Sequence, residues 1–281
     1  MKFYEKIKKI DRRIIYLLVF LSILIPFLPG TEFLRFPVSS TKETEYIFNY
    51  IESLEKGDAV HIDWAFDPSV KAELVPFFKA FFRHCMKKEL KVFIYYATLM
   101  GIGLGKDAVA EITAEDEFAH LREGVDYIHM EWIPISSDIM IFSMSTDYKG
   151  TFKKEGVIFD GVETINDIGF ILGLSGSGWH FTWVDMQIRF GYTLGLAVTA
   201  VMGPDYIPFI QTGQLTGLSF GLRGAAEYEM MVSEKYDPDG PGYYDTATRG
   251  MASLTLSHLV VFGFVLIGNI VYFIEKKNRR S

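Results

Sequence analysis

Five polar side chains are spaced along the chain so that they could meet in one binding site. Asp63 and Asp67 follow the first apolar segment, His129 and Glu131 lie in another, and Ser175 ends a third. Ligands of open parallel sheets usually bind beyond the carboxyl ends of the strands, where such residues would gather. Carboxylate and hydroxyl oxygens also suit a divalent cation. The sequence therefore predicts these five residues as ligand-binding candidates.

A simpler structural role competes with ligand binding at several of these positions. Asp67 precedes Pro68 and Ser69, which is a typical start of a helix, and a capping role is the stronger interpretation of this aspartate. Asp237 and Asp239 resemble the start of a calcium loop, but the later ligands are missing, so a turn is the better interpretation. No metal site and no cofactor are therefore predicted, and no catalytic residue is assigned.

Two glycine-rich segments at predicted strand ends lack the spacing of a complete motif. Residues 101–106 read GIGLGK, which fits neither a P-loop nor GxGxxG. The segment GLSGSG approaches a nucleophile elbow at Ser175, but Ser177 stands where the last glycine belongs. His180 is too close in sequence to be the usual triad partner. Tight turns explain both segments, and a hydrolase built on Ser175 stays an alternative.

Glycines recur every four residues in a segment near the C-terminus. Gly213, Gly217 and Gly221 are followed by Gly224, and this spacing places them on one face of a helix. Each glycine weakens a helix by up to about 1 kcal/mol relative to alanine, so a close contact must offset the loss. Packing within the chain is the favoured explanation. Self-association, with these four glycines as the interface, is a second, and an irregular glycine loop is a third.

Apolar segments alternate with helical patterns through the middle of the chain. Strands are expected at 59–66, 91–97, 126–132, 168–174 and 196–201, and helices at 41–56, 70–88, 107–122 and 183–191. Apolar strands that alternate with helices indicate a parallel sheet covered on both faces. We therefore expect an α/β fold with a doubly wound, mostly parallel sheet of about five strands. Residues 135–165 are less regular and are expected to form an insertion or a long loop.

An uncharged apolar run lies near each end of the chain, at residues 14–28 and 252–274. The second run is long enough to cross a bilayer, which takes about 20 residues. We predict transmembrane helices over 14–30 and 252–274. A cleavable signal peptide is the alternative for the first helix, and a buried core helix is the alternative for the second.

Basic residues flank both predicted spans on the side of the chain termini. Six precede the first run and four follow the second, so both tails, 1–13 and 275–281, are expected in the cytoplasm. The domain at 31–254 is then extracytoplasmic. It carries 18 basic and 32 acidic residues, a formal charge of −14, which repels nucleic acid. Cys85 is the single cysteine, so no intrachain disulfide is possible, and its apolar neighbours predict a buried side chain.

The segment GQLTGLSFGLRGAAEYE, from Gly213 to Glu229, resembles a motif in prokaryotic two-span membrane proteins of uncharacterised function. The preceding residues 203–210 and the short segments 66–69 and 126–127 also resemble that group. The resemblance implies an architecture with two membrane anchors. It implies no activity and no functional residues.

Two functional hypotheses follow from these features. The first is a membrane-anchored extracytoplasmic assembly or scaffold protein, or a subunit of a membrane complex, that forms homo-oligomers through its outer domain. Its partners would be the lipid bilayer, further copies of the chain and another membrane protein, but no nucleic acid. The alternative is a sensor for a small ligand or divalent cation, or a hydrolase, that uses a cleft at the strand carboxyl ends. Whether the chain is an enzyme is left open.

Overall fold

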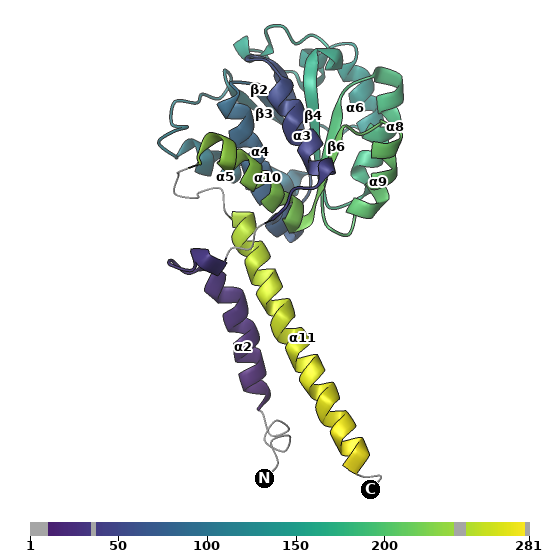
Figure 1. Cartoon of the computed structure of the whole chain (residues 1–281). Coiled ribbons are helices and arrows are strands. Elements are labelled where there is room, and N and C mark those ends of the chain that lie inside the picture. The colour runs from purple at the N-terminus through teal and green to yellow at the C-terminus, as the bar shows by residue number, and fades with distance from the viewer. Residues whose placement is uncertain (1–10, 35–37, 239–245, 279–281) are drawn as a thin grey trace. The chain divides into compact units, whose positions relative to one another are not determined.

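The computed structural model describes residues 11–34, 38–238 and 246–278. The chain divides into two compact units, one of residues 38–247 and one that combines residues 1–37 with 248–281. The first is the α/β unit, and the second contains the terminal helical segments (Figure 1). Most of the predicted N-terminal tail, the last three residues of the C-terminal tail and residues 239–245 lie outside the described residues.

The α/β unit is built on one parallel sheet of six strands in the order β3-β2-β1-β4-β5-β6. Its strands are β1 (Ala59–Ala65), β2 (Lys91–Tyr96), β3 (Tyr127–Met130), β4 (Ile168–Ser175), β5 (Leu194–Val198) and β6 (Gly217–Phe220). Nearly all strand residues are buried, which is why the strands read as continuous apolar runs. The predicted α/β class and parallel sheet are confirmed. The five predicted strands overlap β1 to β5, and β6 is additional.

Helices cover both faces of the sheet (Figure 1). One face carries α3 (Lys42–Ser53), α4 (Lys71–Lys87), α5 (Leu99–Thr113) and α10 (Gly221–Tyr236), and the other carries α6 (Ser137–Met144), α7 (Tyr148–Phe152), α8 (Phe181–Phe190) and α9 (Gly203–Gln211). Short 3-10 turns are η3 (Pro68–Val70), η4 (Val157–Phe159), η5 (Ile165–Asp167) and η6 (Gly178–His180). The irregular segment expected to be an insertion thus contributes α6 and α7.

Alternate residues of β1 show how the two faces are used. The Trp64 ring lies 4.7 Å from the Phe78 ring of α4, centroid to centroid. His61 points to the other face, where its ring lies near Tyr148 of α7 and Trp183 of α8. Because successive side chains of a strand point to opposite faces, residues 61, 63 and 65 all face α6 to α9.

The GIGLGK segment lies inside α5, and its prediction as a loop is wrong. Thr98 caps this helix by accepting a 3.1 Å hydrogen bond from the Gly101 N–H. A Cβ on Gly101 would lie 2.8 Å from the Trp64 side chain, and a Cβ on Gly105 would lie 2.3 Å from the Tyr96 ring. Glycine is needed because α5 packs directly on large aromatic side chains of β1 and β2.

The four candidate interface glycines do not share a helix face, so the predicted glycine-striped helix is wrong. Gly213 has a φ of +77° in the turn after α9, Gly217 begins β6, Gly221 has a φ of +65° at the start of α10, and Gly224 lies within α10. A Cβ on Gly217 would lie 2.6 Å from Ile47 of α3. Close approach within the chain and left-handed turns therefore explain these glycines, and no glycine face remains to support self-association.

The unit of the two chain ends contains α2 (Arg12–Leu24), the turns η1 (Ile25–Phe27) and η2 (Glu32–Leu34), and most of α11 (Thr246–Asn278). Ser253 of α11 donates a 2.8 Å hydrogen bond to the carbonyl of Ile23 in α2. Within residues 11–34, 38–238 and 246–278, α11 is the one helix that is long and apolar enough to cross a membrane. The α-helix α2 ends at Leu24, next to Pro26 of η1, so a first span at 14–30 stays a prediction.

Candidate functional site

The order of the sheet reverses between β1 and β4. These strands are neighbours in space, whereas β2 and β3 separate them in the chain. This is the strand order of Rossmann-like sheets, in which the chain connections diverge on either side of the reversal, and ligands bind at the carboxyl ends of the two central strands. The candidate site lies at this switch point.

Asp63 of β1 is the central residue of the candidate site. It is fully buried on the face of α6 to α9 and is in register with Gly173 of β4. Its Oδ2 accepts a 2.9 Å hydrogen bond from Trp179 Nε1 and lies 3.1 Å from His180 Nε2. A Cβ at residue 173 would lie 2.5 Å from the His180 ring. The glycine therefore makes room for a buried imidazole beside the buried carboxylate.

His61 extends this cluster toward the middle of the sheet. It lies two residues before Asp63, so both side chains point to the same face. The His61 Nδ1 and the Tyr148 hydroxyl are hydrogen-bonded at 2.8 Å, and the Trp183 ring lies 5.7 Å away between centroids. Burial lowers the pKa of His61 to about 4, although the nearby Asp63 opposes the shift. The imidazole is therefore neutral at pH 7.

Several buried polar atoms of this cluster have no hydrogen-bond partner in the described part of the chain. They are Asp63 Oδ1, both ring nitrogens of His180, His61 Nε2 and Trp183 Nε1. The 3.1 Å contact between His180 and Asp63 lacks the alignment of a hydrogen bond. Each unmet bond of this kind costs about 1–3 kcal/mol, and native proteins keep few of them. Because several such atoms lie close together at the switch point, we take this cluster as the candidate binding site.

The cluster can bind a polar molecule and can move a proton. The Asp63 carboxylate accepts hydrogen bonds, and the His180 imidazole has two ring nitrogens that can bond to a ligand. Together they form a carboxylate–imidazole pair of the type used for general acid–base chemistry. No group of three His, Cys, Asp or Glu side chains suited to a metal ion occurs among the described residues. The cluster thus gives no support to the divalent-cation hypothesis.

Two other predicted site residues lie near the switch point, but their side chains bond to the backbone two residues further along the chain. Ser175 is buried at the end of β4, where its Oγ accepts a 3.0 Å hydrogen bond from the Ser177 N–H. Asp67 accepts a 2.7 Å hydrogen bond from the Ser69 N–H and begins η3. Hydrogen bonds from the Ser69 side chain and from its backbone N–H lower the pKa of Asp67. The capping interpretation of Asp67 is thereby confirmed.

The remaining predicted residues do not converge with Asp63. His129 of β3 lies on the opposite face of the sheet, where its Nδ1 is 2.8 Å from the Tyr96 hydroxyl. Burial lowers the pKa of His129 to about 4. Glu131 follows β3 with an 81% exposed side chain, 3.4 Å from Lys154. Of the five predicted residues, the structure therefore brings Asp63 and Ser175 together on neighbouring strands.

Sequence reasoning missed most of the cluster. His61 was detectable, because two polar residues at i and i+2 in an apolar strand share one face. His180 was considered only as a partner of Ser175, whereas it contacts Asp63. Trp183 and Tyr148 come from α8 and α7, and no spacing in the sequence links them to β1.

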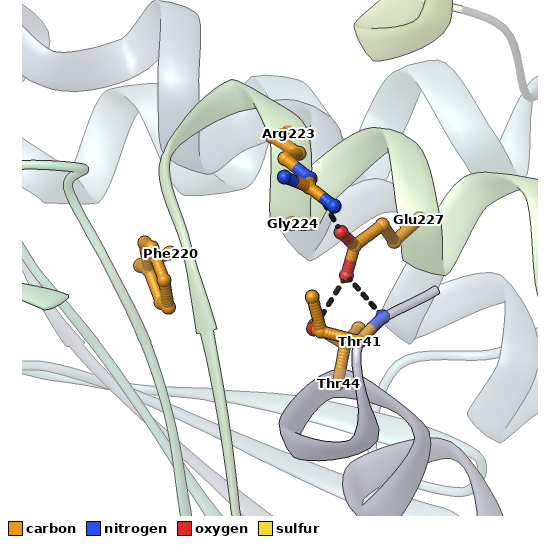
Figure 2. A pocket seen from close by; sticks show the side chains of 6 residues that line it. All are labelled: Thr41, Thr44, Phe220, Arg223, Gly224 and Glu227. Carbon is orange, nitrogen blue, oxygen red and sulfur yellow. Dashed lines mark hydrogen bonds and ion pairs between the residues drawn. The ribbon is translucent and has the colours of Figure 1, made fainter. Parts of the chain in front are cut away.

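A second polar feature is a small pocket between the starts of α3 and α10 (Figure 2). Its volume is about 50 Å³. Glu227 Oε2 accepts hydrogen bonds from the Thr41 N–H at 3.1 Å and the Thr41 hydroxyl at 2.7 Å. Its Oε1 accepts a 2.9 Å bond from Arg223 Nε. Both oxygens are thus bonded within the chain, and this buried carboxylate serves to fix α3 against α10.

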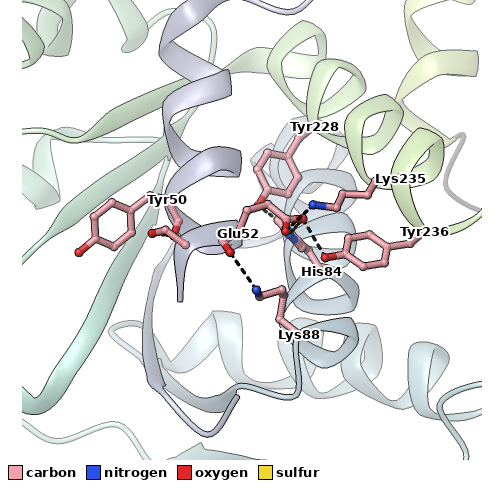
Figure 3. A network of polar contacts seen from close by, with 8 residues as sticks. Tyr50, Glu52, His84, Lys88, Tyr228, Lys235 and Tyr236 are labelled. Atoms are coloured by element: carbon pink, nitrogen blue, oxygen red, sulfur yellow. Dashed lines mark hydrogen bonds and ion pairs between the residues drawn. The ribbon is translucent and has the colours of Figure 1, made fainter. Parts of the chain in front are cut away.

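A third polar feature joins the ends of α3, α4 and α10 on the opposite face from Asp63 (Figure 3). Glu52 accepts hydrogen bonds from His84 Nε2 at 2.9 Å and the Tyr236 hydroxyl at 2.8 Å, and Lys235 Nζ lies 2.6 Å from its carboxylate. The other His84 nitrogen bonds to the Tyr228 hydroxyl at 2.7 Å.

The electrostatics of this network follow from its pairing. Burial acts to raise the pKa of Glu52, but the hydrogen bonds from His84, Lys235 and Tyr236 outweigh it and lower the pKa to about 2. Burial lowers the pKa of His84 more than Glu52 raises it. Lys235 brings a positive charge to within 2.6 Å of the Glu52 carboxylate.

The sequence matches no protein-family model and no curated protein.

Proposed function

We propose that the chain is a membrane-attached binding protein whose α/β unit holds a small polar molecule at the switch point between β1 and β4. α11 is the attachment. Lys276 and Lys277 follow its apolar part, and basic residues prefer the cytoplasmic side of a span. The α/β unit would then lie outside the cytoplasm, where it meets molecules arriving from the environment.

One observation carries the proposal: the partly unbonded pair of Asp63 and His180 is fully buried at the switch point. A carboxylate removed from water loses several kcal/mol of solvation, which a protein recovers only through well-made bonds. Here one carboxylate oxygen and the facing imidazole keep unused bonding capacity. A ligand that supplies a donor to Asp63 and a donor or acceptor to His180 would complete both.

The residues around the pair indicate how a ligand would enter. Ser177 and Gly178 are exposed and Trp179 is partly exposed, whereas the next residue, His180, is buried. The Trp179 indole N–H donates a hydrogen bond to the Asp63 carboxylate. We therefore place the entrance at this turn, where a ligand hydroxyl or amine would replace the indole as the donor to Asp63.

The same geometry makes binding a better-supported function than hydrolysis. A hydrolase built on Ser175 needs a base to take its hydroxyl proton, but that hydroxyl lies 3.1 Å from the Ser177 carbonyl and donates to it. Among the described residues, the contacts of the Asp63–His180 pair include no nucleophile. Proton transfer to or from a bound ligand is chemically open to this pair, and reversible binding needs nothing further.

The test is a ligand screen on the full-length chain in detergent or nanodiscs, read by thermal unfolding and then by calorimetry. The probes are grouped by class as sugars and polyols, amines, amino acids, and nucleosides. A ligand at 100 times its Kd stabilises the folded state by about 2.7 kcal/mol, so a genuine ligand raises the melting temperature measurably. Asp63→Asn is expected to abolish the shift, because an amide replaces the acceptor with a mixed donor and acceptor.

Asp67→Asn is the matched control. It makes the same chemical change at the same edge of the sheet, but Asp67 serves as a local cap. The ligand shift should persist in this variant. If every class leaves the melting temperature unchanged, or if Asp67→Asn removes the shift as fully as Asp63→Asn, the proposal is wrong.

A further inference from the structure

Trp179 is the partly exposed member of the group of side chains that meet at Asp63. Asp63 and His180 are fully buried, whereas the Trp179 side chain reaches solvent. The indole Nε1 donates a 2.9 Å hydrogen bond to Asp63 Oδ2, and His180 Nε2 lies 3.1 Å from the same oxygen. The protein's own indole therefore occupies the position at which the proposed ligand would meet the carboxylate.

An indole is an incomplete partner for this buried pair. Its one polar atom is an N–H donor that accepts nothing, so the bond to Asp63 uses its whole capacity. Both ring nitrogens of His180 have no hydrogen-bond partner in the described part of the chain, and buried groups in that state cost free energy. A ring that carries an N–H and a second polar atom beside it could bond to Asp63 and His180 together. Such a ring would displace the indole because it forms one more hydrogen bond.

The backbone around Trp179 is held in place, while its side chain can turn toward solvent. Ser175 Oγ accepts a 3.0 Å hydrogen bond from the Ser177 N–H and donates a 3.1 Å bond to the Ser177 carbonyl. The Phe181 N–H bonds to the Gly178 carbonyl and closes η6. Side chains that reach solvent change rotamer within nanoseconds, and such a change needs no backbone hinge. The space that the indole vacates would have the flat shape and the size of an indole.

We propose that Trp179 is a movable side chain that fills the ligand site, and that the ligand is a planar nitrogen heterocycle with a ring N–H and a second polar ring atom. This inference rests on the proposed function, because it names the ligand class for the same site. The flat ring takes the space of the indole, and its N–H takes over the bond to Asp63. The second polar atom bonds to His180, which the indole cannot do. Imidazoles, benzimidazoles and purines have this chemistry.

The ligand class is tested by calorimetric titration of the full-length native chain in nanodiscs with benzimidazole and benzoxazole. The two probes have nearly the same shape, but benzoxazole has an oxygen where benzimidazole has its N–H. Benzimidazole should bind at least about ten-fold more tightly, because benzoxazole cannot donate a hydrogen bond to the charged Asp63. This preference should shrink in Asp63→Asn and persist in Asp67→Asn. The comparison uses the native chain, so it does not depend on the folding of a variant.

The movable side chain is tested by Trp179→Phe, which keeps an aromatic ring but has no N–H to compete for Asp63. Benzimidazole should bind about ten-fold more tightly to this variant than to the native chain, because the open state of the site is then more populated. Trp132→Phe is the matched control: Trp132 follows β3, is 37% exposed, and should leave the affinity unchanged. In a chain labelled with fluorotryptophan, benzimidazole should move the fluorine NMR resonance of Trp179 but not that of Trp132.

The outcomes separate this inference from the proposed function. Equal binding of benzimidazole and benzoxazole, or an unmoved Trp179 resonance together with unchanged affinity in Trp179→Phe, would overturn the inference. If a sugar, an amine or an amino acid binds in a way that depends on Asp63 and benzimidazole does not bind, the proposed function stands and the heterocycle is rejected. If no probe of any class binds, both are rejected.

Discussion

Two histidine–carboxylate pairs lie on opposite faces of the same sheet, and they differ in how completely their polar atoms are bonded. In the first pair, Glu52 and His84 are surrounded by Lys235, Tyr228 and Tyr236, and both ring nitrogens of the histidine are hydrogen-bonded. In the second pair, Asp63 and His180, one carboxylate oxygen and both ring nitrogens have no hydrogen-bond partner within the described residues.

The difference separates a structural network from a candidate site. A buried network in which every polar atom is hydrogen-bonded rigidifies the fold, and removing one member leaves the others without a partner. A partly satisfied one costs stability, and a protein keeps such a cost where function requires it. The residue types are similar in the two pairs, but the Glu52 side chain is 16% exposed and Asp63 is fully buried, so the less completely bonded carboxylate is also the more deeply buried one. The following predictions test that distinction.

The largest expected effect is that of Glu52→Ala, which should lower the free energy of unfolding by about 4 kcal/mol. The change leaves the buried His84 ring and the Tyr236 hydroxyl without their partner. The measurement is urea unfolding of the detergent-solubilised full-length chain, followed by tryptophan fluorescence. Glu131→Ala is the control and should cost less than about 0.5 kcal/mol, because the Glu131 carboxylate is exposed. A loss below about 1 kcal/mol in Glu52→Ala would contradict a structural role.

Acidification is expected to have the next largest effect, through His61. Its pKa is about 4 in the folded chain and about 6.5 in an unfolded one. Between these two pKa values, His61 binds a proton in the unfolded state but not in the folded state. Stability is therefore complete above about pH 6.5 and falls by up to about 1.4 kcal/mol per pH unit toward pH 4, about 3 kcal/mol in total.

His61→Gln isolates this contribution, because glutamine does not titrate. Unfolding free energies measured from pH 7 to pH 4 should fall less steeply in the variant than in the native chain. The slopes should differ by up to about 1.4 kcal/mol per pH unit, the contribution of one proton. His129, whose pKa is also lowered to about 4 by burial on the other face, still titrates in both proteins. Identical slopes would show that folding does not shift the pKa of His61.

An intermediate effect is expected from Gly173→Ala, which should cost about 2 kcal/mol and weaken ligand binding. The new Cβ would lie 2.5 Å from the His180 ring and would push it away from Asp63. Gly103→Ala is the control: nothing lies within 4 Å of a Cβ there, and alanine favours the helix, so stability should rise by up to about 1 kcal/mol. If the Gly173→Ala chain is stable and binds the ligand as tightly as the native chain, His180 is not part of the binding site.

The architecture was predictable because it depends on local pattern. β1, β2 and β4 are buried on both faces, so their apolar runs were visible without any knowledge of neighbouring strands. The glycine segments were misread because glycine permits several backbone conformations. GIGLGK is helical where a loop was expected, and β6 begins at Gly217 in a predicted helix. In both cases the partner that requires the glycine, Trp64 or Ile47, lies far away in the sequence.

The site was only partly predictable for a related reason. Asp63 stood out as a carboxylate in an apolar strand, but its contacts Trp179 and His180 come from a turn more than a hundred residues later. Which face a residue occupies also depends on pairing: His129 is placed opposite Asp63 by the register of β2 and β3. Spacing within one segment cannot supply such contacts.

The smallest stability effect is expected from Asp63→Asn, and it is the most discriminating result. The amide keeps the size of the side chain, removes a buried charge that costs several kcal/mol of solvation and retains an acceptor for the Trp179 indole. The free energy of unfolding should therefore change by less than about 1 kcal/mol or increase. Urea unfolding compares it with Glu52→Gln, the same change in the fully bonded pair, which should lower stability by about 2 kcal/mol. If Asp63→Asn destabilises as much as Glu52→Gln, both pairs are structural, and the unbonded atoms no longer mark a binding site.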